Sequence, residues 1–557
     1  MFLFHKFNVP CITFISLIVS TQFLIMSAET SWADETLAKL TLEEKVGQLF
    51  MVSIAATPPP NAAMLYSFNP NIDRESYCQH LIRDCHIGGL IMFSGDPGKQ
   101  VALINRAQNA AHIPLLIGQD CEWGLSMRLK DTIQFPKNMT LGAIQDESLI
   151  YQVGQEIGQQ CKAVGVHINF APVVDINTNP ANPIIGTRSF GHYKEAVARK
   201  GLLFAKGLQS AGVLACAKHF PGHGDTSVDS HLDLPVINHS RERLMAEEIY
   251  PFKVLIDGGV DAIMPAHIAI EALGSPNMSA ILSRSVITDL LRKQLGFEGL
   301  IITDGMNMKG IAKFFLPHES SLRAVQAGND IILCPLDVEG SIAHIIEAVK
   351  NGSMNSKELD AHVLRILKTK EKLGLNKNRE FETKNIATIT HNEKAYSLKK
   401  LLYTKAITVI NNTSGTLPLS INNEDVAIVD IGQQSEGSSL YLPLDADKTS
   451  VTTMLDAIDH SHTIVARIFQ LAQNQGKFGK VTTLASAVEL FLKTALERGK
   501  EVVQILCTTP YCLYLLPRTP TIVAYENDPD ALAAAMDVLW GRAQAEGHLP
   551  IPLTKGE

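Results

Sequence analysis

The chain has 557 residues, of which 46% are hydrophobic and 19% charged, and its formal net charge is −8. This composition is typical of a packed globular protein and excludes long disordered, collagenous or coiled-coil structure. The 49 basic residues are outnumbered by 57 acidic ones, so the basic excess of nucleic-acid-binding proteins is absent. We therefore expect a neutral or small-molecule partner and no nucleic acid. The length suits roughly two to four domains, or a large barrel with a companion domain.

The first 33 residues have the pattern of a signal peptide. Lys6 precedes a mostly apolar run over residues 9–25, and small residues at 26–28 and 31–33 offer cleavage sites. A retained single-span anchor is the alternative, but Ser and Gln residues interrupt the run. No later stretch is apolar over the ~20 residues that a membrane span needs. We predict an exported protein with no stable membrane span after cleavage.

Nine cysteines occur in the chain, eight of them after residue 33. An even number in an exported protein permits disulfides. Several of the cysteines lie in or beside apolar runs, where a free thiol behaves as a small buried hydrophobic group. Neither the 78/85 pair nor the 507/512 pair has Cys-x-x-Cys spacing. Buried thiols are therefore the favoured interpretation, and we predict no metal site and no cofactor.

Short apolar runs alternate with helix-like stretches from residue 45 to residue 335. Buried parallel strands read as such continuous runs, and their alternation with helices indicates βαβ units. The eight runs cover residues 48–54, 88–93, 114–119, 166–174, 213–218, 262–265, 299–303 and 330–334. Eight runs predict a (β/α)₈ TIM-type barrel, and a doubly wound open sheet is the alternative.

Polar residues directly follow the carboxyl ends of five of these runs. They are Asp120, Asp175, the pair Lys218 and His219, His267 and Asp304. In a barrel the strand ends converge on one mouth, which is where catalytic groups lie, whereas an open sheet would spread them along an edge. The barrel explains the cluster better.

A second domain is expected after the barrel. Residues 377–392 are polar and poor in apolar side chains, as an exposed linker is. Further apolar runs at 406–411, 426–431, 462–469, 501–507 and 521–525 then alternate with helix candidates such as 484–498 and 529–539. We predict a barrel over 34–375, a linker over 376–395 and a smaller α/β sandwich domain over 396–557.

The segment 218–231 holds three histidines and two aspartates within fourteen residues, a composition that invites a metal-site interpretation. His219 and His223 have the i, i+4 spacing of zinc-binding helices, but the intervening Pro and Gly forbid a regular helix. A plain surface loop is a further alternative. In an extended segment Asp229 and His231 project to the same side, and a carboxylate beside an imidazole fixes its tautomer and raises its basicity. We therefore favour a catalytic loop with an Asp229–His231 acid/base dyad.

A second stretch, residues 299–308, delivers Asp304 from an apolar strand to the mouth. A single Asp at a strand end is often a helix N-cap. Its place opposite a loop with a His–Asp pair favours a catalytic role instead.

These segments together resemble the β-N-acetylglucosaminidases of glycoside hydrolase family 3, of the bacterial cell-wall recycling type. The Lys-His-Phe-Pro-Gly-His-Gly-Asp-Thr run with its Asp-Ser-His end is highly specific, and Asp120-x-Glu122, residues 182–191 and Ile302-Thr303-Asp304 agree in order. The resemblance covers residues 35–375, and the second domain is similar to one that follows the barrel in some members. Trp123 departs from the Gly that many members have.

The resemblance implies the role of each residue. Asp304 matches the nucleophile, and His231, paired with Asp229, matches the general acid/base. The groups expected to hold the terminal sugar are Asp120, Arg128, Arg188, Lys218 and His219. We expect a periplasmic, retaining β-N-acetylglucosaminidase of peptidoglycan turnover, acting on terminal GlcNAc of muropeptides or glycans. A β-glucosidase or β-xylosidase, a phosphorylase using the same residues, and a non-catalytic glycan-binding protein are the alternatives.

Overall fold

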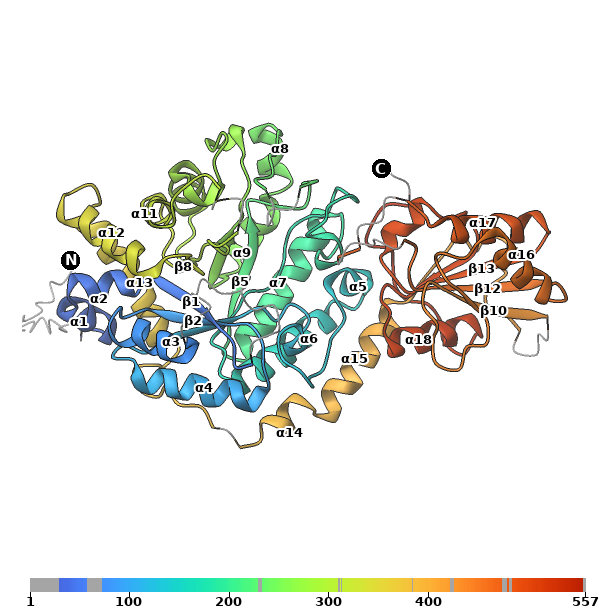
Figure 1. Cartoon of the computed structure of the whole chain (residues 1–557), viewed down its shortest axis with the longest axis horizontal. Helices are drawn as coiled ribbons and strands as arrows, with labels where there is room; N and C mark the ends of the chain where they lie inside the picture. Colours follow the sequence, from blue (N-terminus) through green and yellow to red (C-terminus); the bar gives the residue numbers. More distant parts are fainter. Residues whose placement is uncertain are drawn as a thin grey trace, which may run out of the picture.

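The protein is described by a computed structural model (Figure 1) over residues 30–57, 73–228, 233–308, 311, 313–382, 384–420, 425–472, 478–479 and 483–553. The predicted signal peptide lies almost wholly outside the described residues. Asp229 and His231, the predicted acid/base dyad, also lie outside them.

The first domain is a closed barrel of parallel strands. Its sheet has the order β7-β6-β5-β4-β3-β2-β1-β8, and the two end strands meet through a bridge between Ile302 and Ile331. The strands are β1 (Phe50–Ile54), β2 (Gly89–Met92), β3 (Leu116–Gln119), β4 (Ile168–Asn169), β5 (Leu214–Phe220), β6 (Ala262–Pro265), β7 (Leu300–Ile301) and β8 (Ile332–Leu333). All eight predicted runs contain a strand, and the closure excludes the open-sheet alternative.

Helices surround the barrel (Figure 1) and follow the strands in the order expected of βα units. They are α1 (Trp32–Lys39), α2 (Leu42–Gly47), α3 (Arg74–Arg83), α4 (Pro97–Ala110), α5 (Asn138–Ala143), α6 (Ser148–Ala163), α7 (Lys194–Ser210), α8 (Arg241–Ala246), α9 (Tyr250–Asp257), a π-helix (Ser285–Gln294), α11 (Pro317–Ala327), α12 (Val338–Lys350) and α13 (Ser356–Lys372). Local signals set their starts. Asp96, for example, accepts hydrogen bonds from Gly98 and Lys99 at the start of α4, and Pro97 takes the first helical position.

Two predicted elements are shorter than expected. The stretch 241–257 is two helices rather than one, because Pro251 has no N–H for a helix interior and instead lies in the first turn of α9. In the stretch 166–174 only Ile168 and Asn169 form a strand. Pro172 interrupts the ladder there, although Val173 still forms an isolated bridge with Lys218.

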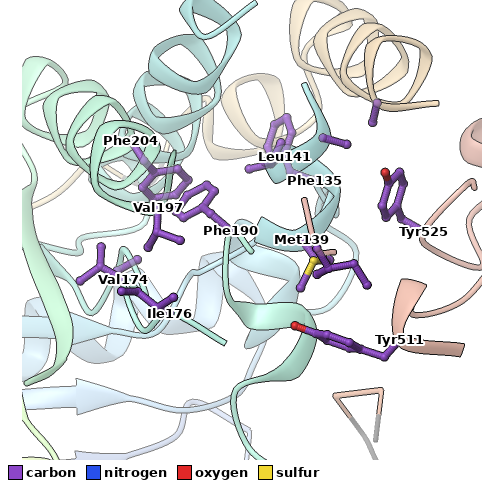
Figure 2. Close-up of a cluster of buried hydrophobic side chains, with 14 of the residues drawn as sticks. Phe135, Met139, Leu141, Val174, Ile176, Phe190, Val197, Phe204, Tyr511 and Tyr525 are labelled. Carbon is purple, nitrogen blue, oxygen red and sulfur yellow. The ribbon is translucent and has the colours of Figure 1, made fainter. Parts of the chain in front are cut away.

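The helices and the sheet enclose a large apolar core. Figure 2 shows the part between α5, α7 and the loops after β3 and β4, where Phe135, Phe190 and Phe204 pack together. Phe190 and Phe204 meet edge to face with ring centroids 6.4 Å apart. Tyr511 and Tyr525 of the second domain border the same cluster, so the two domains share packed surface.

The second domain is a six-stranded sheet with helices on both faces (Figure 1). Its strand order is β11-β10-β12-β13-β14-β9, parallel except for the β14–β9 pair. The elements are α14 (Ile386–Thr390), α15 (Glu393–Ala406), β9 (Thr408–Ile410), β10 (Val426–Ile431), β11 (Tyr441–Leu442), α16 (Lys448–Ala457), β12 (Thr463–Ile468), α17 (Ser486–Glu497), β13 (Glu501–Leu506), β14 (Thr521–Val523) and α18 (Pro529–Leu539). The predicted α/β sandwich is therefore present after the barrel.

The eight cysteines from Cys78 to Cys512 are free thiols, and all of them except Cys85 are buried. This confirms the favoured interpretation of buried thiols for these residues. Within the described ranges, no helix is both long and apolar enough to cross a bilayer.

Candidate active site

Asp120 stands at the centre of an ionic cluster at the mouth of the barrel. It lies just after β3, and Lys218 of β5 donates to its Oδ1 from 2.8 Å. Its Oδ2 accepts a hydrogen bond from Arg128, which comes from the loop that follows β3. The Arg128 guanidinium also lies over the ring of Phe93, 4.8 Å from the centroid. Elements far apart in sequence therefore meet on one carboxylate.

Glu122 is the second carboxylate of the cluster. Arg188 donates to it through two nitrogens, with Nη2 2.6 Å from Oε1 and Nε 3.0 Å from Oε2. Such a bidentate pair fixes the guanidinium plane as well as its position. Lys218 Nζ lies 3.0 Å from Glu122 Oε1, so this one ammonium group bridges Asp120 and Glu122.

The mutual pairing keeps all these groups charged. Burial alone would raise the pKa of Asp120, but Lys218 and Arg128 outweigh it and hold the pKa well below its usual range. Burial likewise opposes ionisation of Glu122, yet Arg188 and Lys218 lower its pKa to about 2. The two carboxylates in turn raise the pKa values of Lys218 and Arg188 despite their burial. At neutral pH three cationic side chains therefore face two carboxylates in this cluster.

A second buried pair lies beside this cluster. His219 Nδ1 is 2.7 Å from Asp175 Oδ2, and Asp175 also accepts from the backbone N–H of His223 at 2.7 Å. His219 Nε2 lies 3.4 Å from Arg188 Nη2, so the imidazole connects this pair to the cluster. Burial opposes the charge on Asp175, but His219 and His223 lower its pKa. His223 is itself engaged, with Nδ1 2.8 Å from the Thr226 hydroxyl.

Asp304 follows β7 and is half-buried at the same mouth. Its Oδ1 accepts from the backbone N–H of Gly305 at 2.7 Å. The buried His267 holds this turn from β6, because its Nε2 is 3.0 Å from the Gly305 carbonyl oxygen. Burial lowers the pKa of His223 to about 4, and the negative charges of Asp175 and Asp304 partly oppose this shift.

The cluster opens to solvent at Asp120 and Arg128. Their side chains are 14% and 23% exposed, whereas those of Lys218, Glu122 and Arg188 are 3%, 2% and 9% exposed. Arg128 Nε is buried and has no hydrogen-bond partner among the described residues. A ligand that enters the mouth therefore meets Asp120 and Arg128 first.

All five residues predicted to hold the sugar lie in this one network, and Asp304 is close to it. In the sequence Asp175 follows a predicted strand and Glu122 belongs to the Asp120-x-Glu122 motif, but neither was predicted to have a role in the site. Their signal was the same one that identified Asp120, a carboxylate at the carboxyl end of an apolar run. Trp123 lies beside the network, with Lys137 Nζ 5.7 Å from its ring centroid.

Known proteins resemble this chain in sequence and in fold. Residues 41–369 match the N-terminal domain of glycosyl hydrolase family 3. Beta-hexosaminidase A of Pseudoalteromonas piscicida is 30% identical over 542 residues, which span 85% of this chain and 90% of the relative. A beta-hexosaminidase of Thiobacillus denitrificans is 34% identical over 262 residues, 45% of this chain and 72% of the relative.

A solved family 3 beta-N-acetylglucosaminidase from a Paenibacillus species superposes with a TM-score of 0.78 at 30% identity, covering 93% of this chain and 100% of that one. A TIM-type barrel with carboxylates at its mouth fits the carboxylate chemistry of glycoside hydrolysis. The chain belongs to glycoside hydrolase family 3.

Proposed function

We propose that this protein is a retaining β-N-acetylglucosaminidase that removes terminal, non-reducing GlcNAc from peptidoglycan-derived glycans. The observation that carries the proposal is the network of Asp120, Glu122, Arg128, Arg188 and Lys218 beside Asp304. Its fixed charges suit the hydroxyl and amide groups of a sugar, which are donors and acceptors without net charge. The names of the relatives, beta-hexosaminidase and beta-N-acetylglucosaminidase, support the choice of GlcNAc.

In the first step Asp304 attacks the anomeric carbon and the bond from that carbon to the leaving oxygen breaks. The leaving oxygen takes a proton from His231. In the second step neutral His231 removes a proton from water, which attacks the same carbon and releases both the sugar and the Asp304 carboxylate. Two displacements at one carbon retain its configuration.

Asp304 suits the part of nucleophile because it lies half-buried at the mouth, with the Gly305 N–H holding one carboxylate oxygen, while Asp120 and Glu122 are engaged by the lysine and arginines of the network. The proposed partner of His231 is Asp229, which would fix the imidazole tautomer and stabilise the imidazolium. A periplasmic location is part of the proposal, and it rests on the signal-peptide pattern of the first 33 residues.

The direct test uses the purified protein with 4-nitrophenyl β-N-acetylglucosaminide, with the β-glucoside as the control, in buffers with and without phosphate. We expect release from the first substrate, loss of that release in Asp304→Ala, and GlcNAc as the product in both buffers. Asp229→Asn should lose most of kcat because the imidazole is no longer oriented by a charge.

Other results would reassign the function. A sugar phosphate in phosphate buffer would make the protein a phosphorylase, and release from the β-glucoside alone would make it a glucosidase. Full activity of Asp304→Ala would remove Asp304 from the mechanism. Sugar binding without any turnover would support a glycan-binding protein.

A further inference from the structure

The second domain reaches the barrel mouth through Phe478. This residue lies between β12 and α17, and its carbonyl oxygen accepts a hydrogen bond of 3.0 Å from the backbone N–H of Thr187. Thr187 adjoins Arg188, the residue that clamps Glu122. The second domain therefore contacts the segment that delivers a charged group to the site.

The segments around Gly186 and Phe478 approach each other closely, and this approach depends on glycine. A Cβ atom on Gly186 would lie 2.0 Å from the Phe478 carbonyl oxygen, and Gly186 has a positive φ of 42°. On the other side, a Cβ on Gly479 would lie 2.6 Å from Thr509 of the second domain. Gly186 therefore lets the barrel backbone approach Phe478, and Gly479 lets the segment after Phe478 pack against Thr509 within the second domain.

The ring of Phe478 lies over the guanidinium of Arg188, with 5.3 Å between the Arg188 Cζ atom and the ring centroid. A cation over an aromatic face at this distance is attracted by the ring quadrupole. The edge of the guanidinium is already occupied, since Nε and Nη2 bond to Glu122 and Nη1 bonds to the Ile184 carbonyl at 3.2 Å. Phe478 therefore covers a face of Arg188 while the barrel holds its edge.

The contact is supported by a broader interface. Asn177 Nδ2 donates to the Tyr511 hydroxyl at 2.6 Å, and Figure 2 shows Tyr511 pointing from the second domain toward that loop of the barrel. Asn177 Oδ1 also accepts from Gly186 N at 3.1 Å. Glu526 accepts from the backbone of Lys137 at 2.7 Å and from the Thr140 hydroxyl at 2.6 Å. The second domain is thus docked at several points around the loops after β3 and β4.

We propose that Phe478 is a positioning residue of the sugar site, through which the second domain holds Arg188 against Glu122. This inference rests on the proposed function, because the role of Arg188 in sugar binding is part of it. The aromatic face, rather than the bulk of the side chain, does the positioning. The second domain is then a component of the sugar site.

The test compares Phe478→Leu, which removes the aromatic face, with Phe478→Tyr, which keeps it. Both are assayed in the full-length protein with 4-nitrophenyl β-N-acetylglucosaminide, and KM, kcat and Tm are measured separately. We expect KM to rise about three- to tenfold in the Leu variant, with a smaller change in kcat, and to return to the wild-type value in the Tyr variant. Tyr396→Leu removes an aromatic ring that is 44% exposed on α15 and serves as the matched control, with an unchanged KM.

An unchanged KM in Phe478→Leu overturns the proposal, provided that the wild type is active. Equal impairment of the Leu and Tyr variants also overturns it, because the ring face would then be irrelevant. If the Leu variant does not fold, Phe478→Met replaces it under the same criteria. An inactive wild-type protein instead contradicts the proposed function, so the two failures are distinguishable.

Discussion

Two buried lysines at opposite ends of the barrel have opposite electrostatic settings. Lys218 at the mouth lies between Asp120 and Glu122, and these carboxylates outweigh burial and raise its pKa. Lys370 of α13 lies at the other end, where its Nζ donates to the neutral Gln48 Oε1 at 2.6 Å. Burial lowers the pKa of Lys370 to about 7. The two carboxylates thus hold the charge of Lys218, whereas the neutral Gln48 does not offset the burial of Lys370.

The cavity at the other end of the barrel also borders a buried titratable side chain whose pKa is lowered by burial. A cavity of about 710 Å³ lies between the amino-terminal ends of β4, β5 and β6 and the segment around Phe381. His167 borders it, and burial lowers the pKa of this histidine to about 3. Its Nδ1 accepts from the Ile117 N–H, and its Nε2 has no partner among the described residues. A cavity of this volume therefore lies at the end of the barrel opposite the ionic cluster.

From this comparison we expect changes at the mouth to alter catalysis and changes at the opposite end to alter stability. The largest expected effect is that of Asp304→Ala. Loss of the nucleophile should lower kcat by at least about a thousandfold and leave Tm within a few degrees of the wild type. Steady-state kinetics and thermal unfolding measure the two quantities. A large fall in Tm would mean that Asp304 is chiefly structural.

Lys218→Met should lower both the catalytic activity and the stability of the protein. It leaves Asp120 and Glu122 buried with one cation fewer, and breaking a buried pair costs about 3–5 kcal/mol of unfolding free energy. Urea unfolding at pH 7 measures this loss, and activity should fall with it. Lys253→Met is the matched control, because its pair with Asp257 is exposed on α9 and adds little. Equal stability of the two variants would contradict the network.

Lys370→Met should change the pH dependence of stability and leave kcat unaltered. The folded pKa of about 7 lies below the 10.5 of an unperturbed lysine, so the unfolded chain binds more protons between these values. Stability therefore rises with pH across that window, by up to roughly 1.4 kcal/mol per pH unit. Urea unfolding from pH 7 to pH 10 should show this slope in the wild type and a flatter profile in the variant. Identical profiles would mean that Lys370 does not titrate there.

The smallest effect is expected at His167. Its folded pKa of about 3 lies below the usual 6.5, so its contribution to stability is lost as pH falls through this window. His167→Asn keeps an acceptor for the Ile117 N–H and removes the titration. Acid unfolding between pH 6.5 and pH 4 should be shallower in the variant. A steeper curve than that of the wild type would refute the assignment.

Much of the barrel could be predicted from the sequence, because a parallel strand buried on both faces leaves a continuous apolar run. The run 262–265 coincides with β6, and Asp120 and Lys218 were predicted from their places at strand ends. The division of residues 241–257 into α8 and α9 was missed, although Pro251 was a visible signal.

The side-chain contacts between residues of the site could not be predicted from the sequence in the same way. Nothing near Glu122 in the sequence indicates Arg188, which is 66 residues away, and nothing near Arg188 indicates Phe478. Such pairs form only when the barrel closes and the second domain docks, and their sequence separations carry no periodic signal.

The sequence by itself determined the strands, most of the helices and the polar residues that end each strand, since these follow from local apolar pattern and backbone chemistry. Only the tertiary structure decided which charges meet. The sequence neighbours of Lys218 and Lys370 do not identify their partners, and the folded barrel gives one of them two carboxylates and the other an amide. Because a buried charge is set by its neighbours in space, the state of each lysine is a property of the fold.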